Sequence, residues 1–249
     1  MSSFYISSMN LKLKIFSMKQ TKLVLVFAAI FFSGLLVNAQ SKTKKWDFKK
    51  GEVLDILLFN GKPELPKLFP RYRETAFAFA LEKGYKPQPF LAVVETTQGG
   101  YQPDTYVIAK WTDLASRKAF TNEILDKVPD FHEQRRAMWS SFNLAYYEVT
   151  KDISFEVNPN KILVATSYWK DDTNTFSAFK KEWLKKAKNK GGKVLLELND
   201  AMSTVGYMYK PDFIVLTEWN DRASFDTFSN EILKRGDKGI QNVNQFIIK

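Results

Sequence analysis

The sequence predicts an α+β protein built from two tandem copies of one β-α-β-β-α-β unit. The main observation is a duplication: PDTYVIAKWTDLASRKAFTNEIL at 103–125 recurs as PDFIVLTEWNDRASFDTFSNEIL at 211–233, an offset of 108 residues. Unrelated stretches of this length share roughly one or two identical positions, whereas these two share 12. Such a repeat is typical of one supersecondary unit used twice. The order of apolar runs around each copy, and a strand that is apolar on both faces, give the rest of the prediction.

The first copy is expected over 51–150. It opens on a short apolar run that suits a buried strand, and apolar residues at helical spacing follow until Gly84, where a helix should stop. Asp113 is placed to cap a second helix, along which Phe120 and Ile124 lie one turn apart. The expected elements are strand 53–59, helix 65–80, strands 90–96 and 105–111, the helix after Asp113, and strand 144–149.

The second copy is expected over 162–249 and follows the same order. Gly191 and Gly192 end its first helix, and Asp221 caps its second one. A polar stretch at 151–161 is predicted to link the copies. The expected elements are strand 162–168, helix 175–188, strands 194–198 and 213–219, the helix after Asp221, and strand 243–248.

The third strand of each copy predicts how the copies pack. Along 105–111, alternate residues point to opposite faces, and both faces are largely apolar. The unit's own helices can cover only one face, so the other needs a second sheet, which the second copy supplies. We therefore expect two ferredoxin-like βαββαβ repeats that form a pseudo-dimeric α+β barrel with its helices outside.

The residues of the duplicated segment also resemble a known family. Val107, Trp111, Asp113, the Ala115-Ser116 pair and Phe120 give the pattern V-x-x-x-W-x-D-x-A-S-x-x-x-F, which covers about a fifth of each repeat. It is similar to the dimeric α+β barrel superfamily, which includes antibiotic-biosynthesis-monooxygenase-like domains and heme-degrading monooxygenases. Members usually pair two chains to form the barrel, so the resemblance implies a tandem fused pair here.

The first 39 residues have the pattern of a secretory signal peptide. Lys19 and Lys22 precede the apolar run Leu23–Val37, and small residues end at Ala39. Met18 is the expected start, and 40–50 form an N-terminal segment of the mature chain. The chain has no cysteine, so it has no disulfide and no thiol for a lipid anchor. We expect a secreted or periplasmic bacterial protein with no membrane anchor after cleavage.

The net charge of +10 is concentrated partly in the lysine-rich stretch 179–193. Phe176, Phe179 and Trp183 recur at helical spacing, which leaves the lysines on a solvated helix face. An alternative is an adhesion or interaction module that binds anionic surfaces. No nucleic acid is expected as a partner, and further self-association is left open. The lysines concerned are Lys180, Lys181, Lys185, Lys186 and Lys188.

The copies differ most between the second helix and the last strand. The first copy has 126–143 there and the second only 234–242, and the longer stretch carries the single histidine, His132, with Arg135 and Trp139. The resemblance implies that heme-degrading members use a histidine on or after the second helix, an asparagine on the first strand and a tryptophan. His132 and Asn60 lie near the first two positions, whereas Glu123 stands where the tryptophan is expected.

No catalytic group is identifiable, since one histidine and no cysteine exclude multi-histidine metal sites and thiol chemistry. We predict a binding protein for a small apolar or aromatic molecule, with no cofactor. The alternative is a monooxygenase-like enzyme, cofactor-independent or heme-binding, with its site in the first copy and His132 as the iron ligand. Trp111 and Trp219 are read either as site residues or as packing. The candidate residues are Asn60, Trp111, His132, Arg135, Trp139, Tyr147 and Trp219.

Overall fold

The computed structural model describes residues 44–204, 206–236 and 239–249, and Thr43–Lys249 form one compact unit. The predicted signal peptide, 1–39, and the first residues of the segment 40–50 lie outside the described residues. Among the described helices, none is both long and apolar enough to cross a membrane.

Repeat 1, residues 51–150, contains the predicted order of strands and helices. Its four main strands lie in one antiparallel sheet, and Asp113 caps α4 by accepting a hydrogen bond from the Ser116 amide at 2.7 Å. The stretch 126–143 adds helix α5 and the start of the last strand. The elements are β2 (Val53–Gly61), α2 (Leu65–Tyr72), the π-helical turn η1 (Arg73–Phe77), α3 (Ala78–Glu82), β3 (Tyr85–Lys86), β4 (Phe90–Gln98), β5 (Thr105–Trp111), α4 (Leu114–Lys127), α5 (Phe131–Met138) and β6 (Trp139–Glu148).

The first helix of repeat 1 is continuous from α2 to α3 but contains a π-helical turn. Pro66 lies in the first turn of α2, where its missing amide hydrogen leaves no bond unmade. Pro70 lies inside α2 and cannot donate to the preceding turn, and η1 begins three residues later. A wider turn is a common way for a helix to accommodate such a gap.

Repeat 2, residues 162–249, repeats the architecture, and its first helix has no π-helical turn. Asp172 and Asp221 cap its helices by accepting from the Thr175 and Ser224 amides at 2.6 and 2.7 Å. The buried face of α6 consists of Phe176, Phe179, Trp183 and Ala187, which is the predicted apolar face. The elements are β8 (Ile162–Lys170), α6 (Thr173–Asn189), β9 (Lys193–Asn199), β10 (Phe213–Trp219), α7 (Arg222–Leu233) and β11 (Ile240–Ile248).

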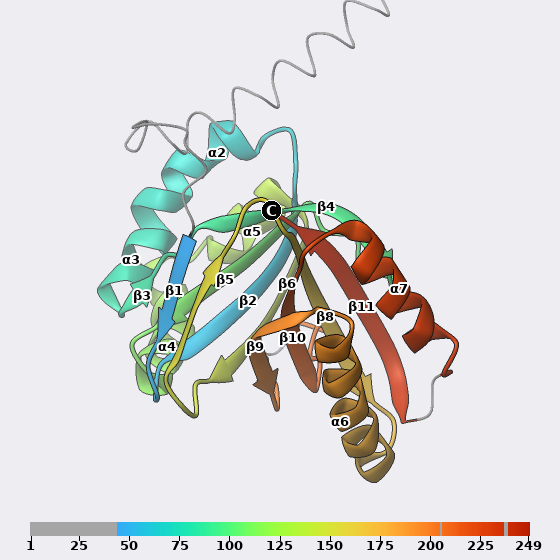
Figure 1. Ribbon diagram of the computed structural model, residues 1–249. Coiled ribbons are helices and arrows are strands. Elements are labelled where there is room, and N and C mark those ends of the chain that lie inside the picture. The colour runs from blue at the N-terminus through green and yellow to red at the C-terminus, as the bar shows by residue number, and fades with distance from the viewer. Residues whose placement is uncertain (1–43, 205, 237–238) are drawn as a thin grey trace, which may run out of the picture. The chain divides into compact units, whose positions relative to one another are not determined.

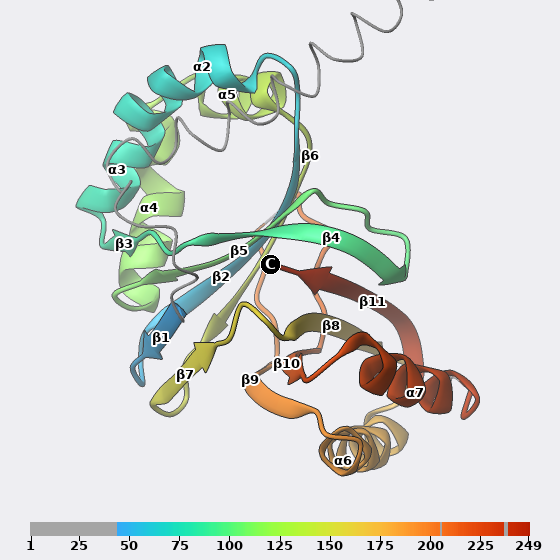
Figure 2. The same ribbon diagram turned by 45° about the horizontal axis from the view of Figure 1, so that its top comes forward.

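The strands of both repeats form one sheet in the order β6-β2-β5-β4-β11-β8-β10-β9, with β3 beside β5. The repeats join where β4 pairs antiparallel with β11. The sheet curls so that its two halves face each other, with α2 to α5 outside one half and α6 and α7 outside the other (Figures 1 and 2). The predicted α+β barrel is thereby confirmed.

The barrel has two seams between the repeats: the β4–β11 pairing, and the place where the edge strands β6 and β9 meet. The second seam is closed without a continuous strand pairing. One backbone bridge joins Tyr146 of β6 to Met202, just after β9, through two hydrogen bonds of 2.8 Å. The two seams are therefore unequal, although the repeats that form them have the same strand order.

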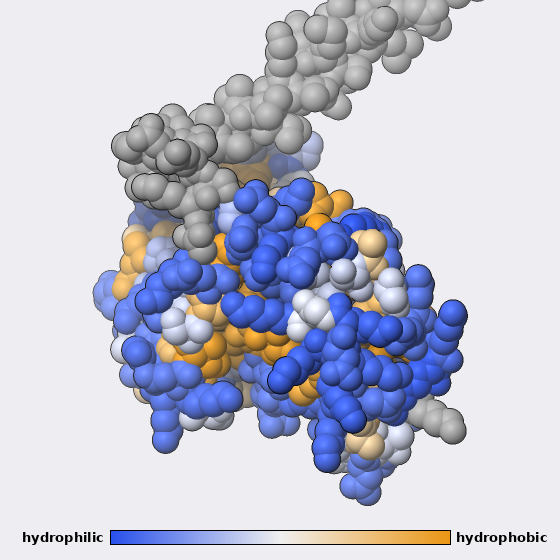
Figure 3. Space-filling model, viewed as in Figure 1, coloured by the Kyte–Doolittle hydropathy of each residue, from blue (hydrophilic) through white to orange (hydrophobic). Residues whose placement is uncertain are grey.

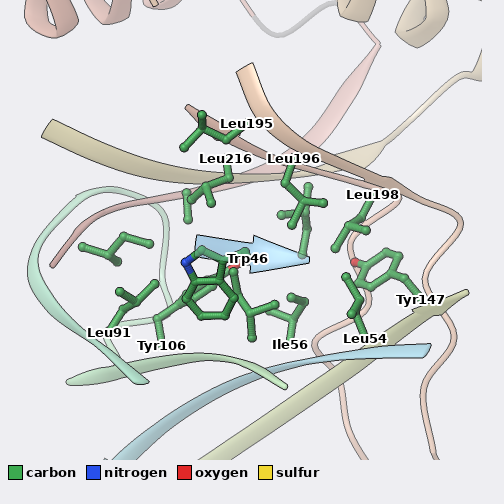
Figure 4. Packing of buried hydrophobic residues seen from close by; sticks show 14 of the residues in the cluster. Trp46, Leu54, Ile56, Leu91, Tyr106, Tyr147, Leu195, Leu196, Leu198 and Leu216 are labelled. Atoms are coloured by element: carbon green, nitrogen blue, oxygen red, sulfur yellow. The ribbon is translucent and has the colours of Figure 1, made fainter. Parts of the chain in front are cut away.

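A two-stranded ribbon of β1 (Lys44–Phe48) and β7 (Ile153–Val157) precedes the first strand of each repeat. The sequence predicts the stretch 151–161 as a linker, but it contains strand β7. The physical reason is that Ile153, Phe155 and Val157 alternate with polar residues, as in a strand with one buried face. Trp46 of β1 is 1% exposed, and Figure 4 shows it between side chains of the two halves, such as Ile56 and Leu216. Side chains therefore fill the barrel interior.

Candidate functional site at the barrel mouth

One end of the barrel, which we call the mouth, gathers polar and aromatic side chains from both repeats. Neighbouring strands are antiparallel, so β2, β4, β8 and β9 all end there. The first strands start in register with the paired tryptophans, Val53 with Trp111 and Ile162 with Trp219. Counting along them makes Asn60 of β2 equivalent to Trp169 of β8, and both lie at the mouth.

Three aromatic rings lie at the centre of the mouth. Tyr101 and Tyr209 occupy equivalent positions two residues before Pro103 and Pro211, and their ring centroids are 5.3 Å apart. Trp169 stacks on Tyr101 with centroids 6.2 Å apart and makes an edge contact with Tyr209. The Tyr209 hydroxyl is hydrogen-bonded to Ser167 at 2.6 Å, and burial raises the pKa of Tyr209, which keeps the phenol neutral.

The loop between β4 and β5 crosses the mouth and is fixed at several points. Asn60 Nδ2 donates to the Gln102 carbonyl at 3.0 Å, and the Gly61 amide donates to Asp104 at 3.1 Å. Gly99 has a φ of +93°, and a Cβ there would lie 2.3 Å from the Val243 carbonyl oxygen. The close approach of β11 therefore requires glycine at this position.

A cleft of about 360 Å³ lies between this loop and the inner ends of β2 and β6. Its volume lies within the usual range of small-molecule sites. Asn60 is itself engaged, since its Oδ1 accepts a hydrogen bond from Ser141. The Asn143 side chain, by contrast, is half-buried and makes no hydrogen bond within the described part of the chain. The lining residues are Leu58, Asn60, Gly100, Tyr101, Gln102, Pro103, Ser141 and Asn143.

The predicted site residue Trp111 lies away from the cleft, on the outer face of the repeat 1 sheet. It is 2% exposed, and its Nε1 donates to Asp55 Oδ2 at 2.9 Å. Arg117 donates from Nε to the other Asp55 oxygen, also at 2.9 Å, and both charged side chains are 4% exposed. Trp111 thus donates a hydrogen bond to the buried Asp55–Arg117 ion pair, and these contacts hold α4 against β2 and β5.

Trp219, the equivalent residue of repeat 2, is fully buried. Its Nε1 donates to Thr217 Oγ1 at 2.9 Å, and its ring packs on Phe225 and Phe228 of α7. A Cβ at Gly192 would lie 2.7 Å from the Trp219 ring, so this glycine permits the packing. The packing interpretation therefore accounts for both tryptophans.

The predicted insert residues lie in the outer helical layer of repeat 1. The Arg135 guanidinium lies 4.2 and 4.3 Å from the ring centres of Phe131 and Phe142, and its Nη1 donates to the Tyr207 hydroxyl at 2.7 Å. Burial alone would lower the pKa of Arg135, but the tyrosine oxygens beside it raise that pKa overall. Since Tyr207 belongs to the β9–β10 loop, Arg135 ties this loop to α5.

Trp139 and His132 have opposite surroundings on the same insert. Trp139 is 8% exposed, contacts Phe59 and Phe142, and its Nε1 has no hydrogen-bond partner within the described residues. His132 is exposed on α5, and its ring contacts Phe131. Neither residue lines the cleft, so the structure does not bring His132 and Asn60 into one pocket.

Tyr147 lies inside the barrel and is fully buried. Its hydroxyl donates to the Pro211 carbonyl at 3.1 Å, and burial raises its pKa well above the usual value. This contact links β6 of repeat 1 to the start of β10 in repeat 2. Tyr147 thus supports the mouth from beneath without lining the cleft.

The lysine-rich face of α6 is partly used in ion pairs. Lys180 pairs with Glu197 at 3.7 Å and Lys186 with Glu182 at 3.1 Å, whereas Lys181, Lys185 and Lys188 are exposed. Figure 3 shows a mainly hydrophilic surface over this helix, at the lower right. This is the solvated face that the helical spacing predicts.

The mouth offers hydrogen bonds and aromatic contact. Among the described residues, no group of three or more histidine, cysteine, aspartate or glutamate side chains could hold a metal ion. Sequence reasoning found Asn60 but missed Tyr101 and Asn143. Extending the duplication two residues upstream pairs Tyr101 with Tyr209 and would have marked the loop, whereas Asn143 carries no local signal.

The chain is similar to known proteins in its backbone fold and not in its sequence. No protein-family model and no curated protein matches this sequence. A mutant chlorite dismutase from Candidatus Nitrospira defluvii is similar in structure, with 9% sequence identity over 81% of this chain and 93% of that one and a TM-score of 0.47. An anthrone oxidase-like protein matches with 13% identity over 82% and 94%, also at 0.47. The fold assignment rests on the strand order described above.

Proposed function

We propose that this protein binds a small, uncharged organic molecule in the cleft at the barrel mouth. The observation that supports the proposal is the cleft of about 360 Å³, which is lined by the ring of Tyr101, by Leu58 and by the unshared side-chain amide of Asn143. Binding sites for small molecules usually combine apolar walls with a few placed polar groups. We also retain, as proposals, membership of the dimeric α+β barrel superfamily and export by the segment 1–39.

The lining favours a neutral ligand. Among the residues that the structure describes, no lysine, arginine, aspartate or glutamate lines the cleft, so a charged ligand group would lose its hydration there without gaining an opposite charge. Tyr101 and Leu58 supply apolar contact, and Asn143 and Ser141 supply hydrogen-bonding atoms. A small aromatic molecule with one polar group therefore suits the cleft.

A variant that fills the cleft tests the proposal. Asn143→Phe adds a ring at the cleft wall, and Asn174→Phe adds the same ring on the exposed side of α6 as a matched control. A library of neutral aromatic fragments would be screened against all three proteins by ligand-observed NMR. We expect fragments that bind the wild type and the control but not the filled variant. If every fragment that binds the wild type also binds Asn143→Phe, the proposal is contradicted.

The second candidate is a monooxygenase-like enzyme that uses the same cleft. The observation in its favour is that Asn60, which corresponds to the asparagine implied by the family resemblance, lines the cleft. Oxygen uptake would be measured with the fragments that bind, for the wild type and Asn60→Ala. Oxygen uptake that requires a bound fragment and is lost in Asn60→Ala supports an enzyme. If fragments bind and no oxygen is consumed, the binding protein is supported instead.

The described residues around His132 do not fit a heme. An iron ligand needs an adjacent slot large enough for the macrocycle, and the exposed His132 lines neither the mouth cleft nor the groove of about 430 Å³ between α3 and α4. Titration of the purified protein with hemin tests this fit. We expect the same Soret spectrum for the wild type and His132→Ala, and a band lost on substitution would restore the heme alternative.

A further inference from the structure

We propose that Asn143 recognises a cyclic amide of the ligand, whose carbonyl and N–H lie on the same side, in the way that Asn244 holds the backbone carbonyl and N–H of Tyr101. The inference rests on the proposed function and names the chemical group that the cleft selects. It follows from a difference between two positions that the internal duplication makes equivalent.

The equivalence of Asn143 and Asn244 follows from strand register. Asn143 of β6 pairs with Leu58 of β2, and Asn244 of β11 pairs with Ser167 of β8. Leu58 and Ser167 are each the sixth residue of their strands, and those strands start in register with Trp111 and Trp219. The two asparagines thus occupy the same place in their repeats, at the mouth.

Asn244 uses this place to hold the backbone of Tyr101. Its Nδ2 donates to the Tyr101 carbonyl at 3.0 Å, and its Oδ1 accepts from the Tyr101 amide at 3.5 Å. This carbonyl and this N–H belong to the two peptide groups on either side of the Tyr101 Cα, and one asparagine side chain pairs with both because it carries a donor and an acceptor side by side. The mouth therefore already contains one asparagine that pairs with a carbonyl and an N–H lying on the same side.

Asn143 lacks this partner because the second loop follows another course. Tyr101 lies three residues after β4 ends at Gln98, whereas its equivalent Tyr209 lies ten residues after β9 ends at Asn199. The extra residues leave the mouth: Met202 bridges to Tyr146, and Tyr207 reaches Arg135. Asn143 is left facing the cleft with its amide unshared among the described residues.

The geometry assigns the ligand a carbonyl that accepts from Asn143 Nδ2 and an N–H that donates to Asn143 Oδ1. Both groups must lie on the same side, because Nδ2 and Oδ1 belong to one side-chain amide. The trans amide of an open chain points its carbonyl and N–H in opposite directions, whereas a cyclic amide (a lactam) holds them side by side. A lactone of the same shape keeps the carbonyl but replaces the N–H with an oxygen, which leaves Oδ1 unpaired beside a second acceptor. Loss of such a hydrogen bond in a partly buried site corresponds to about a tenfold loss of affinity.

The lactam 3,4-dihydro-2(1H)-quinolinone and the lactone 3,4-dihydrocoumarin make a matched probe pair, since they share a benzene ring for Tyr101 and differ only in N–H against O. Their dissociation constants would be measured by NMR titration of the mature protein. We expect the wild type and the control Asn174→Leu to prefer the lactam by about tenfold. Asn143→Leu should bind both probes alike, and Asn143→Ser, which retains a polar side chain, serves if the leucine variant does not fold.

The outcomes separate this inference from the proposed function. Equal binding of both probes to the wild type, or a preference that survives at Asn143→Leu and Asn143→Ser, overturns the amide assignment alone. Failure of both probes to bind the wild type also overturns the amide assignment alone. Binding of both probes that persists in Asn143→Phe overturns the mouth cleft as the site and the amide assignment with it.

Discussion

The buried ion pair of repeat 1 has an apolar counterpart in repeat 2, which allows a stability prediction to be tested within one chain. Asp55 and Arg117 are each 4% exposed at the side chain and bond at 2.9 Å, and Trp111 donates to the same carboxylate. By the alignment of the repeats, Val164 and Phe225 occupy the positions of Asp55 and Arg117. Repeat 2 therefore builds the same packing without charge.

Replacing one member of the pair should be strongly destabilising. Asp55→Val leaves the Arg117 charge buried without its partner, which costs about 3–5 kcal/mol. In a domain of this size, that corresponds to a fall in melting temperature of about 6–20 °C. The exposed pair of Lys49 and Asp152, with side chains 66% and 63% exposed, is the control, and Asp152→Asn should leave the urea midpoint close to that of the wild type.

Transplanting the whole arrangement of repeat 2 should recover most of the loss. Asp55→Val with Arg117→Phe removes both charges, and Ala109→Thr adds the hydroxyl that Thr217 offers to the equivalent tryptophan. Buried ion pairs can often be replaced by apolar residues at little net change. We expect the triple variant to unfold within about 2 kcal/mol of the wild type.

Urea denaturation followed by tryptophan fluorescence and circular dichroism measures these differences. The reasoning fails if Asp55→Val loses less than about 1 kcal/mol, because a charge left buried must then be solvated by local rearrangement. It also fails if the triple variant is no more stable than Asp55→Val, because the two repeats would then pack differently despite their matching positions.

Three further predictions concern the ribbon, the loop and the helix caps. Trp46→Ala should lower the free energy of unfolding by about 3–5 kcal/mol, measured by denaturation, since the ring fills the barrel interior. Gly99→Ala should displace the β4–β5 loop and weaken fragment binding in NMR titrations, because its Cβ would meet the Val243 carbonyl. The pKa values of Asp113, Asp172 and Asp221 are lowered chiefly by hydrogen bonds to Ser116, Thr175 and Ser224. Their contribution is complete above the unfolded pKa of about 3.9 and is lost as the pH falls through the folded values. Acid denaturation of the triple Asp→Asn variant should accordingly begin at lower pH, since asparagine caps without ionising.

Most of the fold could be predicted because the signals are local and occur twice. The third strands, 105–111 and 213–219, lie where their apolar runs and tryptophans predict, and Asp113 and Asp221 cap the helices that follow. Strand β7 was missed although Ile153, Phe155 and Val157 alternate, because the surrounding polar residues are also typical of a linker.

The candidate site was harder to predict because it depends on contacts between distant residues. Tertiary packing makes Trp111 and Trp219 core residues and leaves His132 on an exposed helix face. Arg135 contacts Tyr207, which is 72 residues away in the chain. Composition and spacing carry no information about such pairs, so the sequence could not show that Asn60 lies at the mouth whereas His132 and Arg135 lie in the outer helical layer.

The sequence by itself determined the repeated unit, its helices and strands, and the need for two sheets to cover two apolar faces. These follow from the periodicity of apolar side chains, a property of each segment alone. Only the tertiary structure decided that the two seams of the barrel are unequal. The extra residues of the β9–β10 loop are drawn to Tyr146 and Arg135, so Asn143 and Asn244, equivalent in the repeats, end with different neighbours. The cleft lies beside Asn143, which has no hydrogen-bond partner among the described residues, because long-range packing determines which polar group is paired.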